Sequence, residues 1–402
     1  MNIAKKLWCR IYQGVFRLAL PILPYREPKQ LENNESVAEV LRSNNITKVL
    51  LVTDQGLAKL KLFQPLVDTL TNNGITVVVY DKTVPNPTTD NVEESYTMYK
   101  DNGCQAIIAF GGGSPMDCAK ATGIRVVKPK KALGKFAGVI KLWKRLPLLI
   151  AVPTTAGTGS ETTLAAVITD SNTRHKYAIS SFPLIPRYAL LDPTLTVGLP
   201  PHITSTTGMD ALTHAVEAYI GRSTTKETRS RAMDAVKLIF ANLEEAYHNG
   251  NNLEARRNML RASYYAGIAF TKAYVGYVHA IAHTLGGKYN IPHGLANAII
   301  LPIMLEEYGT KIHKKLKELA VYSSIAEKQD TEKVASEKFI KWIYDINKEM
   351  EISTFISEIK EEDLEDLINY ALKEGNPLYP VPVLMDKKDF RRIYLRIKNN
   401  NK

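Results

Sequence analysis

Short apolar runs recur through the first half of the chain, and each stops at a glycine, proline or aspartate. They show little polar alternation, which is typical of strands buried on both faces of a largely parallel sheet. Helical patterns such as residues 90–103 lie between them. The first half is therefore predicted to be a Rossmann-like α/β domain, with helices that cover a mostly parallel sheet. The apolar runs occupy residues 48–54, 75–81, 106–113, 146–153 and 187–193.

The strand pattern ends near residue 200, where apolar residues at helical spacing begin. Residues 199–201 read Leu-Pro-Pro, and paired prolines continue neither a strand nor a helix. We therefore predict an α/β domain over residues 1–199 and an all-α domain over residues 200–402. The segments with apolar residues three or four positions apart are 206–220, 228–248 and 253–270.

Length and composition agree with two globular domains. A chain of 402 residues is long enough for two cores of ordinary size. The apolar fraction of 45% and the charged fraction of 23% are ordinary for a folded protein. The three cysteines are too few and too scattered for a disulfide framework or a CxxC metal motif. We expect a reducing compartment, and the cytoplasm fits best.

Basic residues outnumber acidic ones, which gives a formal net charge of +11. Such a charge permits a nucleic-acid or membrane-surface partner. Residues 125–145 are rich in Lys and Arg and contain no acid. A segment of this kind is most often a solvated loop and helix face, and contact with an anionic surface is the alternative. No zinc-finger, RNP or basic-zipper pattern is present, so we expect no nucleic-acid partner.

The first 25 residues mix apolar and basic side chains. Arg10 and Arg17 interrupt the apolar run, and no small-x-small cleavage site follows, so we expect no secretion signal. No uninterrupted apolar run approaches the roughly 20 residues that a membrane-spanning helix needs. Two interpretations stay open, namely a helix docked on the protein itself and an amphipathic helix at a membrane surface.

An apolar run that ends in three glycines at 111–113 predicts an anion site. Ser114 suits the N-cap of a following helix, Pro115 its first position, and Asp117 the acid of a capping box. Glycines before a helix N-terminus let backbone amides approach a phosphate closely, and the helix dipole favours its charge. The spacing is neither GxGxxG nor a Walker A loop, so a plain glycine-rich turn is the alternative.

A second strand ends in residues 154–160, a turn rich in hydroxyls and glycines that includes Thr154, Thr155 and Thr158. Two such loops at the carboxyl ends of strands would meet in the crevice where open α/β sheets bind ligands, and a dinucleotide fits that crevice. Asp54 ends the first apolar run, where an acid could bind the ribose hydroxyls of NAD and repel the 2′-phosphate of NADP. The same residue could equally be the N-cap of the next helix.

A carboxylate and several histidines recur at helical spacing in the second half. Asp210 and His214 are four residues apart, as are His279 and His283, so each pair shares one helix face. Pro292 breaks the local pattern and lets His293 approach from another direction. Together these groups suit Fe(II), Zn(II) or a similar divalent ion.

Spacing alone leaves the roles of these five residues open. Each histidine taken singly could be a buried structural residue, and an ion with four ligands would leave one of the five over. His279 is not followed by a glutamate, so the segment lacks the general base of an HExxH metalloprotease.

The sequence resembles the iron-dependent (group III) alcohol dehydrogenases. The matching segments are "GGGSPMDCAK", "PTTAGTGSE", "DPTLTVGLPP", "TGMDALTHAVEAY" and "HAIAHTLGGKYNIPHG", in the order of the family. They extend over most of the chain from about Asp54 to Leu301, and together they are highly specific. The resemblance also implies an α/β nucleotide-binding domain followed by a helical metal-binding domain.

The resemblance assigns roles to individual residues. It implies that Asp210, His214, His279 and His293 bind the metal, and that His283 lies in the active site without being a principal ligand. We expect His283 to relay the proton of the alcohol. The residues implied in cofactor binding are Asp54, Asn86, Gly112, Gly113, Ser114, Asp117, Thr154, Thr155, Thr158, Lys176 and Leu195.

The implied activity is interconversion of an alcohol and an aldehyde with NAD and a metal, with Fe(II) expected and Zn(II) as the alternative. A polyol, diol or lactaldehyde dehydrogenase, or a cyclase similar to dehydroquinate synthase, could use the same scaffold. A non-enzymatic surface-binding protein is the alternative from another class. The family also implies a homo-oligomer, expected to be a dimer. The sequence does not identify the alcohol or aldehyde.

Overall fold

Six parallel strands form the central sheet of the α/β domain in this computed structural model, which describes residues 3–399. The domain comprises residues 24–197. Every neighbouring pair of strands in this sheet is parallel, which confirms the prediction from the uninterrupted apolar runs. In order across the sheet, the strands are β1 (Lys29–Leu31), β9 (Tyr188–Leu190), β6 (Leu148–Pro153), β4 (Ala106–Gly111), β2 (Lys48–Val52) and β3 (Thr76–Tyr80).

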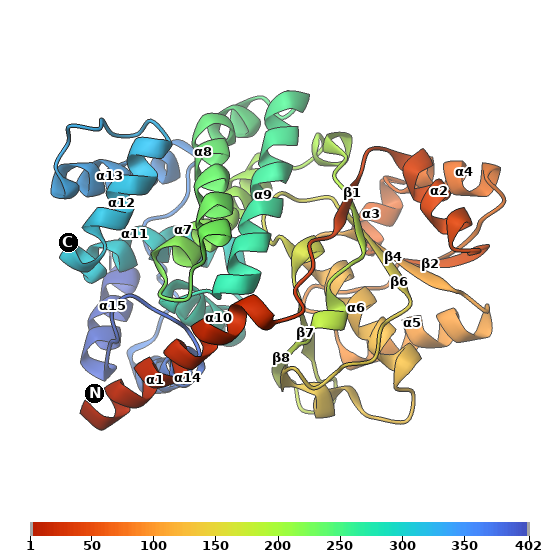
Figure 1. Ribbon diagram of the computed structural model, residues 1–402, viewed down its shortest axis with the longest axis horizontal. Coiled ribbons are helices and arrows are strands. Elements are labelled where there is room, and N and C mark those ends of the chain that lie inside the picture. Colours follow the sequence, from red (N-terminus) through yellow and green to blue (C-terminus); the bar gives the residue numbers. More distant parts are fainter. Residues whose placement is uncertain (1–2, 400–402) are drawn as a thin grey trace. The chain divides into compact units, whose positions relative to one another are not determined.

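Different helices cover the two faces of this sheet. Successive side chains of a strand point to opposite faces, so Val49 and Leu51 pack with α2 and α4, whereas Leu50 and Val52 pack with α5 and α6. Figure 1 shows these two groups of helices on opposite sides of the strands. The helices are α2 (Asn34–Ser43), α3 (Gln55–Lys59), α4 (Gln64–Asn72), α5 (Thr89–Asp101) and α6 (Gly113–Val127).

A second, smaller sheet was not predicted. Its strands β7 and β8 pair in antiparallel fashion, and β5 pairs with β8. In β7 the buried Ala166 and Ile168 alternate with partly exposed neighbours, so the strand does not stand out as an apolar run. The elements are β5 (Gly138–Val139), β7 (Ala165–Thr169) and β8 (Lys176–Ser180), with the 3-10 turns η2 (Leu133–Phe136), η3 (Ser160–Thr162), η4 (Phe182–Leu184) and η5 (Pro193–Thr196).

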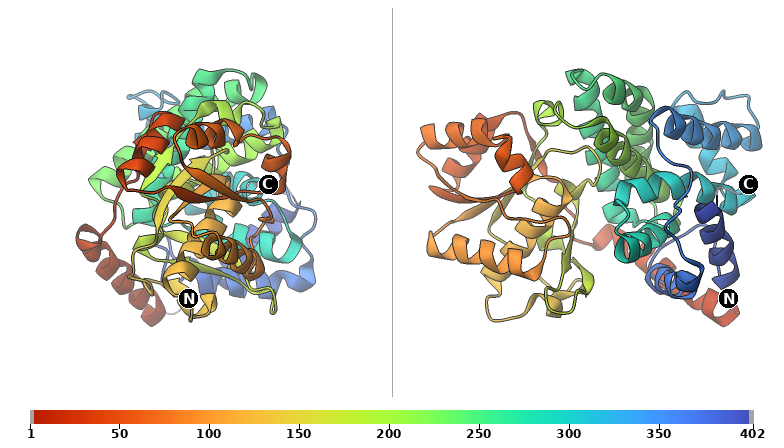
Figure 2. Two further views of the ribbon diagram at one scale, coloured as in Figure 1. Left: turned by 90° about the vertical axis from the view of Figure 1, so that its right-hand side faces the viewer. Right: turned by 180° about the vertical axis from the view of Figure 1, so that it is seen from behind.

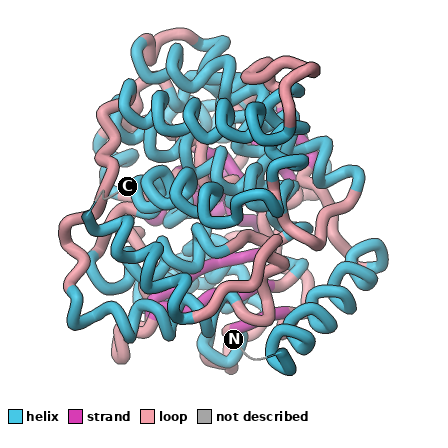
Figure 3. Tube along the Cα trace, turned by 90° about the vertical axis from the view of Figure 1, so that its left-hand side faces the viewer, coloured by secondary structure: helices cyan, strands magenta, loops and turns pink. Residues whose placement is uncertain are grey.

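The other domain contains only helices and loops among its described residues, as predicted. The larger part of this domain begins at Gly198. Within it, α11 is buried along most of its length. Figures 2 and 3 show its helices packed against one another in layers. They are α7 (Pro201–Ile220), α8 (Lys226–His248), α9 (Leu253–Ala273), α10 (Tyr277–Tyr289), α11 (His293–Tyr308), η6 (Gly309–Lys311), α12 (His313–Tyr322), α13 (Glu332–Glu349), η7 (Glu361–Asp363), α14 (Leu364–Gly375) and α15 (Lys387–Asn399).

The N-terminal helix corrects the predicted domain division. The segment up to Leu23, which contains α1 (Ile3–Ala19) and η1 (Leu20–Ile22), belongs to the helical domain and not to the α/β domain. The Arg10 guanidinium donates to the carbonyl oxygens of Val381 and Pro382, which lie 371 and 372 residues further along the chain, so no local pattern predicts this packing. None of the described helices is long and apolar enough to cross a membrane.

The start of α6 also differs from the prediction. The helix begins at Gly113 with Gly112 as its N-cap, so Ser114 is not the cap and Pro115 occupies the third position. Asp117 forms no capping box; its carboxylate accepts hydrogen bonds from the backbone N–H of Val167 and from the Ser160 hydroxyl. The tight turn through the glycines lets the helix begin earlier than the side chains suggested.

Candidate metal centre and nucleotide-binding loops

Asp210, His279 and His293 bring three potential ligands together inside the helical domain. Asp210 Oδ1 lies 3.8 Å from His279 Nε2 and 3.5 Å from His293 Nε2. The three residues come from α7, α10 and α11, and their ligand atoms lie within 4.8 Å of one another. Asp210 and His279 are buried, whereas the His293 side chain is 39% exposed. The cluster is therefore reached from the side of His293.

His214, the fourth predicted ligand, lies against this cluster. It follows Asp210 by one turn of α7, and its Nδ1 lies 3.8 Å from Asp210 Oδ1. Its ring stacks on Phe270 and on His279, with centroid separations of 4.0 and 4.4 Å. These two stacked rings hold the imidazole of His214 in place beside the other three groups.

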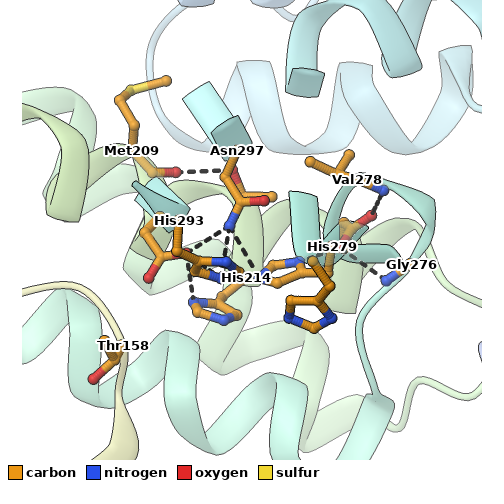
Figure 4. Close-up of polar contacts among 12 residues, drawn as sticks. Thr158, Met209, His214, Gly276, Val278, His279, His293 and Asn297 are labelled. Atoms are coloured by element: carbon orange, nitrogen blue, oxygen red, sulfur yellow. Dashed lines mark hydrogen bonds and ion pairs between the residues drawn. The ribbon is translucent and has the colours of Figure 1, made fainter. Parts of the chain in front are cut away.

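Glu217 holds His279 in one orientation. Its Oε2 lies 2.6 Å from His279 Nδ1 and accepts the backbone N–H of Gly276, while Oε1 accepts the backbone N–H of Val278 (Figure 4). Burial raises the pKa of Glu217 to about 7, and the backbone N–H groups of Gly276 and Val278 lower it, so these hydrogen bonds favour the carboxylate against the effect of burial. A proton held on Nδ1 leaves the lone pair on Nε2, the atom that faces Asp210. Burial lowers the pKa of His279 well below its usual value, which favours the neutral, metal-binding imidazole.

Asn297 connects the three clustered groups. Its Nδ2 donates to Asp210 Oδ1 at 2.7 Å, and it lies 3.3 Å from His279 Nε2 and 3.2 Å from His293 Nε2. Figure 4 shows its amide directed toward the imidazoles. Asn297 is fully buried and lies one turn after His293 on α11. This helical spacing predicts that the two side chains share a face, a signal that the sequence analysis missed.

His283 takes a different position from the other histidines. Its Nδ1 lies 2.6 Å from Glu374 Oε1, which also accepts the Tyr379 hydroxyl. Its ring stacks on His293 with centroids 5.2 Å apart, and its side chain is 41% exposed. His283 thus lies next to the cluster but turns Nδ1 toward a separate carboxylate.

The donor set fits a divalent metal ion. A carboxylate oxygen with imidazole nitrogens is a ligand set that iron and zinc both accept. Ligands at about 2.1 Å around a tetrahedral ion lie roughly 3.4 Å apart. The separations of 3.5 and 3.8 Å between Asp210 Oδ1 and the two Nε2 atoms are close to that value.

In the α/β domain, the predicted loops follow strands that are neighbours in the sheet. The chain passes from β2 to β3 on one side and returns to β4 on the other side, so the strand order reverses between β2 and β4. Ligands of open α/β sheets bind at such a reversal, beyond the carboxyl ends of the strands. Asp54 follows β2, the glycines follow β4, and Thr154 follows β6, which pairs with β4.

The glycines of this loop permit close packing, and the conformation of Gly111 strains any residue with a Cβ. Gly111 has φ +144°, and a Cβ there would lie 2.7 Å from the Pro115 ring. A Cβ on Gly112 would lie 3.3 Å from Thr155 Oγ1, and one on Gly113 would lie 3.2 Å from Thr158 Cγ2. The two predicted loops therefore touch each other, and the bare backbone at the start of α6 is the kind of cradle that a phosphate occupies.

Three of the other predicted cofactor residues are connected by hydrogen bonds, and two lie elsewhere in the α/β domain. Asn86, Ser114 and Lys176 are joined, since Lys176 Nζ donates to Asn86 Oδ1 at 2.7 Å and the Asn86 N–H donates to Ser114 Oγ. Asp54 caps α3 through Oδ1, which accepts the Leu57 N–H. Leu195 lies in η5, where it packs against the apolar core under α2 and α4.

Lys120 is a buried cation of this region that the sequence analysis missed. Its Nζ donates to oxygens of Ser160, Thr163 and Ala165, all between 2.7 and 3.1 Å. Burial lowers the pKa of Lys120 to about 8 and raises that of the neighbouring Glu161 to about 7. Lys120 thereby fixes the segment that follows the second loop.

Comparison with known proteins identifies the family. A model of iron-containing alcohol dehydrogenases matches residues 29–193, and a model of the C-terminal domain of Fe-containing alcohol dehydrogenases matches residues 204–397. The 1,3-propanediol dehydrogenase of Klebsiella pneumoniae is 40% identical over 333 residues, 82% of this chain and 86% of its own. The chain belongs to the iron-containing alcohol dehydrogenase family. It is thus an oxidoreductase by family, as the sequence motifs predicted.

Solved structures of the family show the same fold. A 1,3-propanediol oxidoreductase matches with a TM-score of 0.89 and 36% identity, over 93% of this chain and 99% of that chain. An alcohol dehydrogenase from Oenococcus oeni matches with a TM-score of 0.88 and 36% identity, over 93% of this chain and 100% of that chain. The family match begins at residue 29, so α1 precedes the part of the chain that the family model describes.

Proposed function

We propose that this member of the family is an NAD-dependent alcohol dehydrogenase that interconverts an alcohol and an aldehyde at a divalent metal ion. The observation that carries the proposal is the convergence of Asp210, His279 and His293 on one point, with Glu217 behind His279. In the oxidative direction, alcohol and NAD⁺ give aldehyde, NADH and one proton. Neutral imidazole and carboxylate ligands from three helices are what a Lewis-acid site requires.

Asp210, His279 and His293 would hold the ion, with His214 as the fourth ligand that the family resemblance implies. A bound ion supplies a Lewis acid that lowers the pKa of an alcohol and polarises a carbonyl. The family favours Fe(II), although zinc commonly binds such nitrogen and oxygen ligands more tightly. Metal analysis of protein reconstituted separately with Fe(II) and Zn(II), paired with activity, tests this assignment.

NAD is proposed to lie along the glycine loop, with its phosphates at the start of α6 near Thr155 and Thr158. Hydride transfer is the chemistry that the nicotinamide supplies. Asp54 uses one carboxylate oxygen to cap α3, and its other oxygen can accept a ribose hydroxyl. Asp54→Gly should therefore raise activity with NADP relative to NAD, and an unchanged ratio of the two kcat/KM values would refute this role.

His283 is proposed to pass the proton of the alcohol toward solvent. The Glu374 carboxylate fixes its Nδ1, so Nε2 is the atom at which a proton is taken up and released. His283→Ala should lower kcat while the metal content stays near that of the unaltered protein. His248→Ala is a matched control, because His248 also pairs with an exposed glutamate, Glu349, at 3.0 Å. Loss of metal in His283→Ala would instead make His283 a ligand.

The substrate is tested with a panel of alcohols and aldehydes. Relatives named 1,3-propanediol dehydrogenase and alcohol dehydrogenase make a short diol and a simple primary alcohol the first candidates. The panel should pair 1,3-propanediol, 1,2-propanediol with lactaldehyde, and linear alcohols with their aldehydes, each with NAD and with NADP. If no aldehyde oxidises NADH in a sample with verified iron content, the proposed activity is wrong.

A cytoplasmic dimer is proposed from the family resemblance, and light scattering in solution tests the dimer.

A further inference from the structure

Helix α1 presents a continuous apolar stripe to solvent. Ile3, Leu7, Ile11, Val15 and Leu18 recur every three or four residues, so a helix of 3.6 residues per turn places them along one side. They are 50–86% exposed. Large apolar side chains scattered singly over a surface are ordinary, but a stripe of five along one helix marks an interaction surface. Trp8 and Tyr12 lie on the same side, at 57% and 38% exposure.

The opposite side of α1 fixes the helix to its own domain. Cys9 is buried there, and the Gln13 amide donates to the carbonyl oxygen of Tyr379 at 2.7 Å. Arg10 donates to two carbonyl oxygens of the same loop, and the Phe16 ring packs edge-on against Tyr274 with centroids 4.8 Å apart. These contacts determine which side of α1 faces inward, so the apolar stripe is held outward. Figure 3 shows the helix beside the N mark at the edge of the helical domain.

The charges on α1 indicate what covers the stripe. Lys6 and Arg17 are exposed and lie about 100–120° around the helix from the middle of the stripe. Residues 3–26 contain no aspartate or glutamate. A second copy would bring another basic segment without acids beside this one, whereas an anionic surface attracts Lys6 and Arg17. Long cationic side chains beside an apolar stripe, with Trp and Tyr at its border, are typical of helices that lie in a membrane interface.

We propose that α1 docks this enzyme on anionic phospholipid surfaces, with its apolar stripe inserted among the acyl chains and with Lys6 and Arg17 near the headgroups. A helix of 17 residues that carries an apolar stripe and no acid lies in the plane of such a surface. The stripe contains none of the residues assigned to the metal centre or the glycine loop, so the proposal does not depend on the proposed activity. Because α1 precedes the residues that match the family, docking is a property of this chain beyond the family fold.

Cosedimentation of the full chain with vesicles tests the proposal. Vesicles of phosphatidylcholine mixed with phosphatidylglycerol should bind the protein, and phosphatidylcholine alone should bind it more weakly. Leu7→Gln/Leu18→Gln should weaken binding to the mixed vesicles by about 10–100-fold, because two exposed leucines lose their transfer to an apolar phase. Lys6→Gln/Arg17→Gln should weaken it on the order of tenfold, and added salt should have the same direction of effect.

The matched control is Leu60→Gln/Leu253→Gln, which makes the same change at two exposed leucines of other helices and loops. It should bind vesicles as the unaltered protein does. Circular dichroism and melting temperature confirm that each variant is folded. Absence of binding to the mixed vesicles, or equal loss in the control, would overturn the proposal. A change of oligomeric state in Leu7→Gln/Leu18→Gln without any vesicle binding would assign the stripe to a second copy instead.

Discussion

Replacing Glu217 by glutamine tests how the metal centre is held. The Glu217 carboxyl group accepts the backbone N–H groups of Gly276 and Val278, both at 2.8 Å, and its Oε2 lies 2.6 Å from His279 Nδ1. Glutamine has one acceptor oxygen and one NH₂ group, so in either orientation the NH₂ faces at least one N–H donor. A lost hydrogen bond to a charged group costs about 1.5–3 kcal/mol, which is the expected fall in the free energy of unfolding for each bond lost.

The effect on the metal should exceed the effect on folding. Without the carboxylate, His279 can place its proton on Nε2, the atom that would bind the ion, and its ring can turn. Loss of such an outer partner typically weakens metal binding by about 10–100-fold. The affinity is measured by competition with a chelator in the full chain, with metal content checked by mass spectrometry.

Glu318→Gln is the matched control for Glu217→Gln. Glu318 accepts one hydroxyl, from Tyr219 at 2.6 Å, and a glutamine oxygen can accept the same bond. Its metal affinity should therefore equal that of the unaltered protein. If Glu217→Gln bound metal within a factor of about two of the unaltered protein, the account of His279 orientation would be refuted.

Three further substitutions test other parts of the structure. Lys120→Met leaves several buried oxygens without their donor, and chemical denaturation should show a loss of about 3 kcal/mol or more; a loss below about 1 kcal/mol would contradict the role of this cation. Burial raises the pKa of Glu161 from 4.5 to about 7, so the folded form binds more protons in this window and stability falls as pH rises through it. Glu161→Gln should remove that part of the slope in a pH series of unfolding curves, and an unchanged slope would refute it. Gly294→Ala would place a Cβ 2.3 Å from the Thr206 carbonyl oxygen, so the melting temperature should fall by an amount that corresponds to about 1–3 kcal/mol. Gly287→Ala, where a Cβ meets nothing within 4 Å, should not lower it.

The sequence predicted those features that depend on neighbouring residues. Apolar runs without polar alternation predicted five of the six strands of the parallel sheet, because burial on both faces is visible within each run, whereas β1 has two exposed residues and was missed. The pairs Asp210 with His214 and His279 with His283 followed from helical spacing alone. The same spacing could have identified Glu217 and Asn297, which lie on helices two turns after Asp210 and one turn after His293.

Only the tertiary structure decided which of these groups meet. Glu217 and His279 are 62 residues apart, and His283 and Glu374 are 91 apart, so no local pattern relates them. The packing of helix α1 on the helical domain was equally beyond any local pattern, because its hydrogen bonds reach a loop more than 360 residues away. Helical and strand periodicity is a property of the chain over a few residues, whereas contacts between distant segments depend on how whole elements pack. The sequence by itself therefore determined most strands of the main sheet, the helical character of the second half and the candidate ligands. The packing of α7, α10, α11 and α14 determined the partners of His279 and His283.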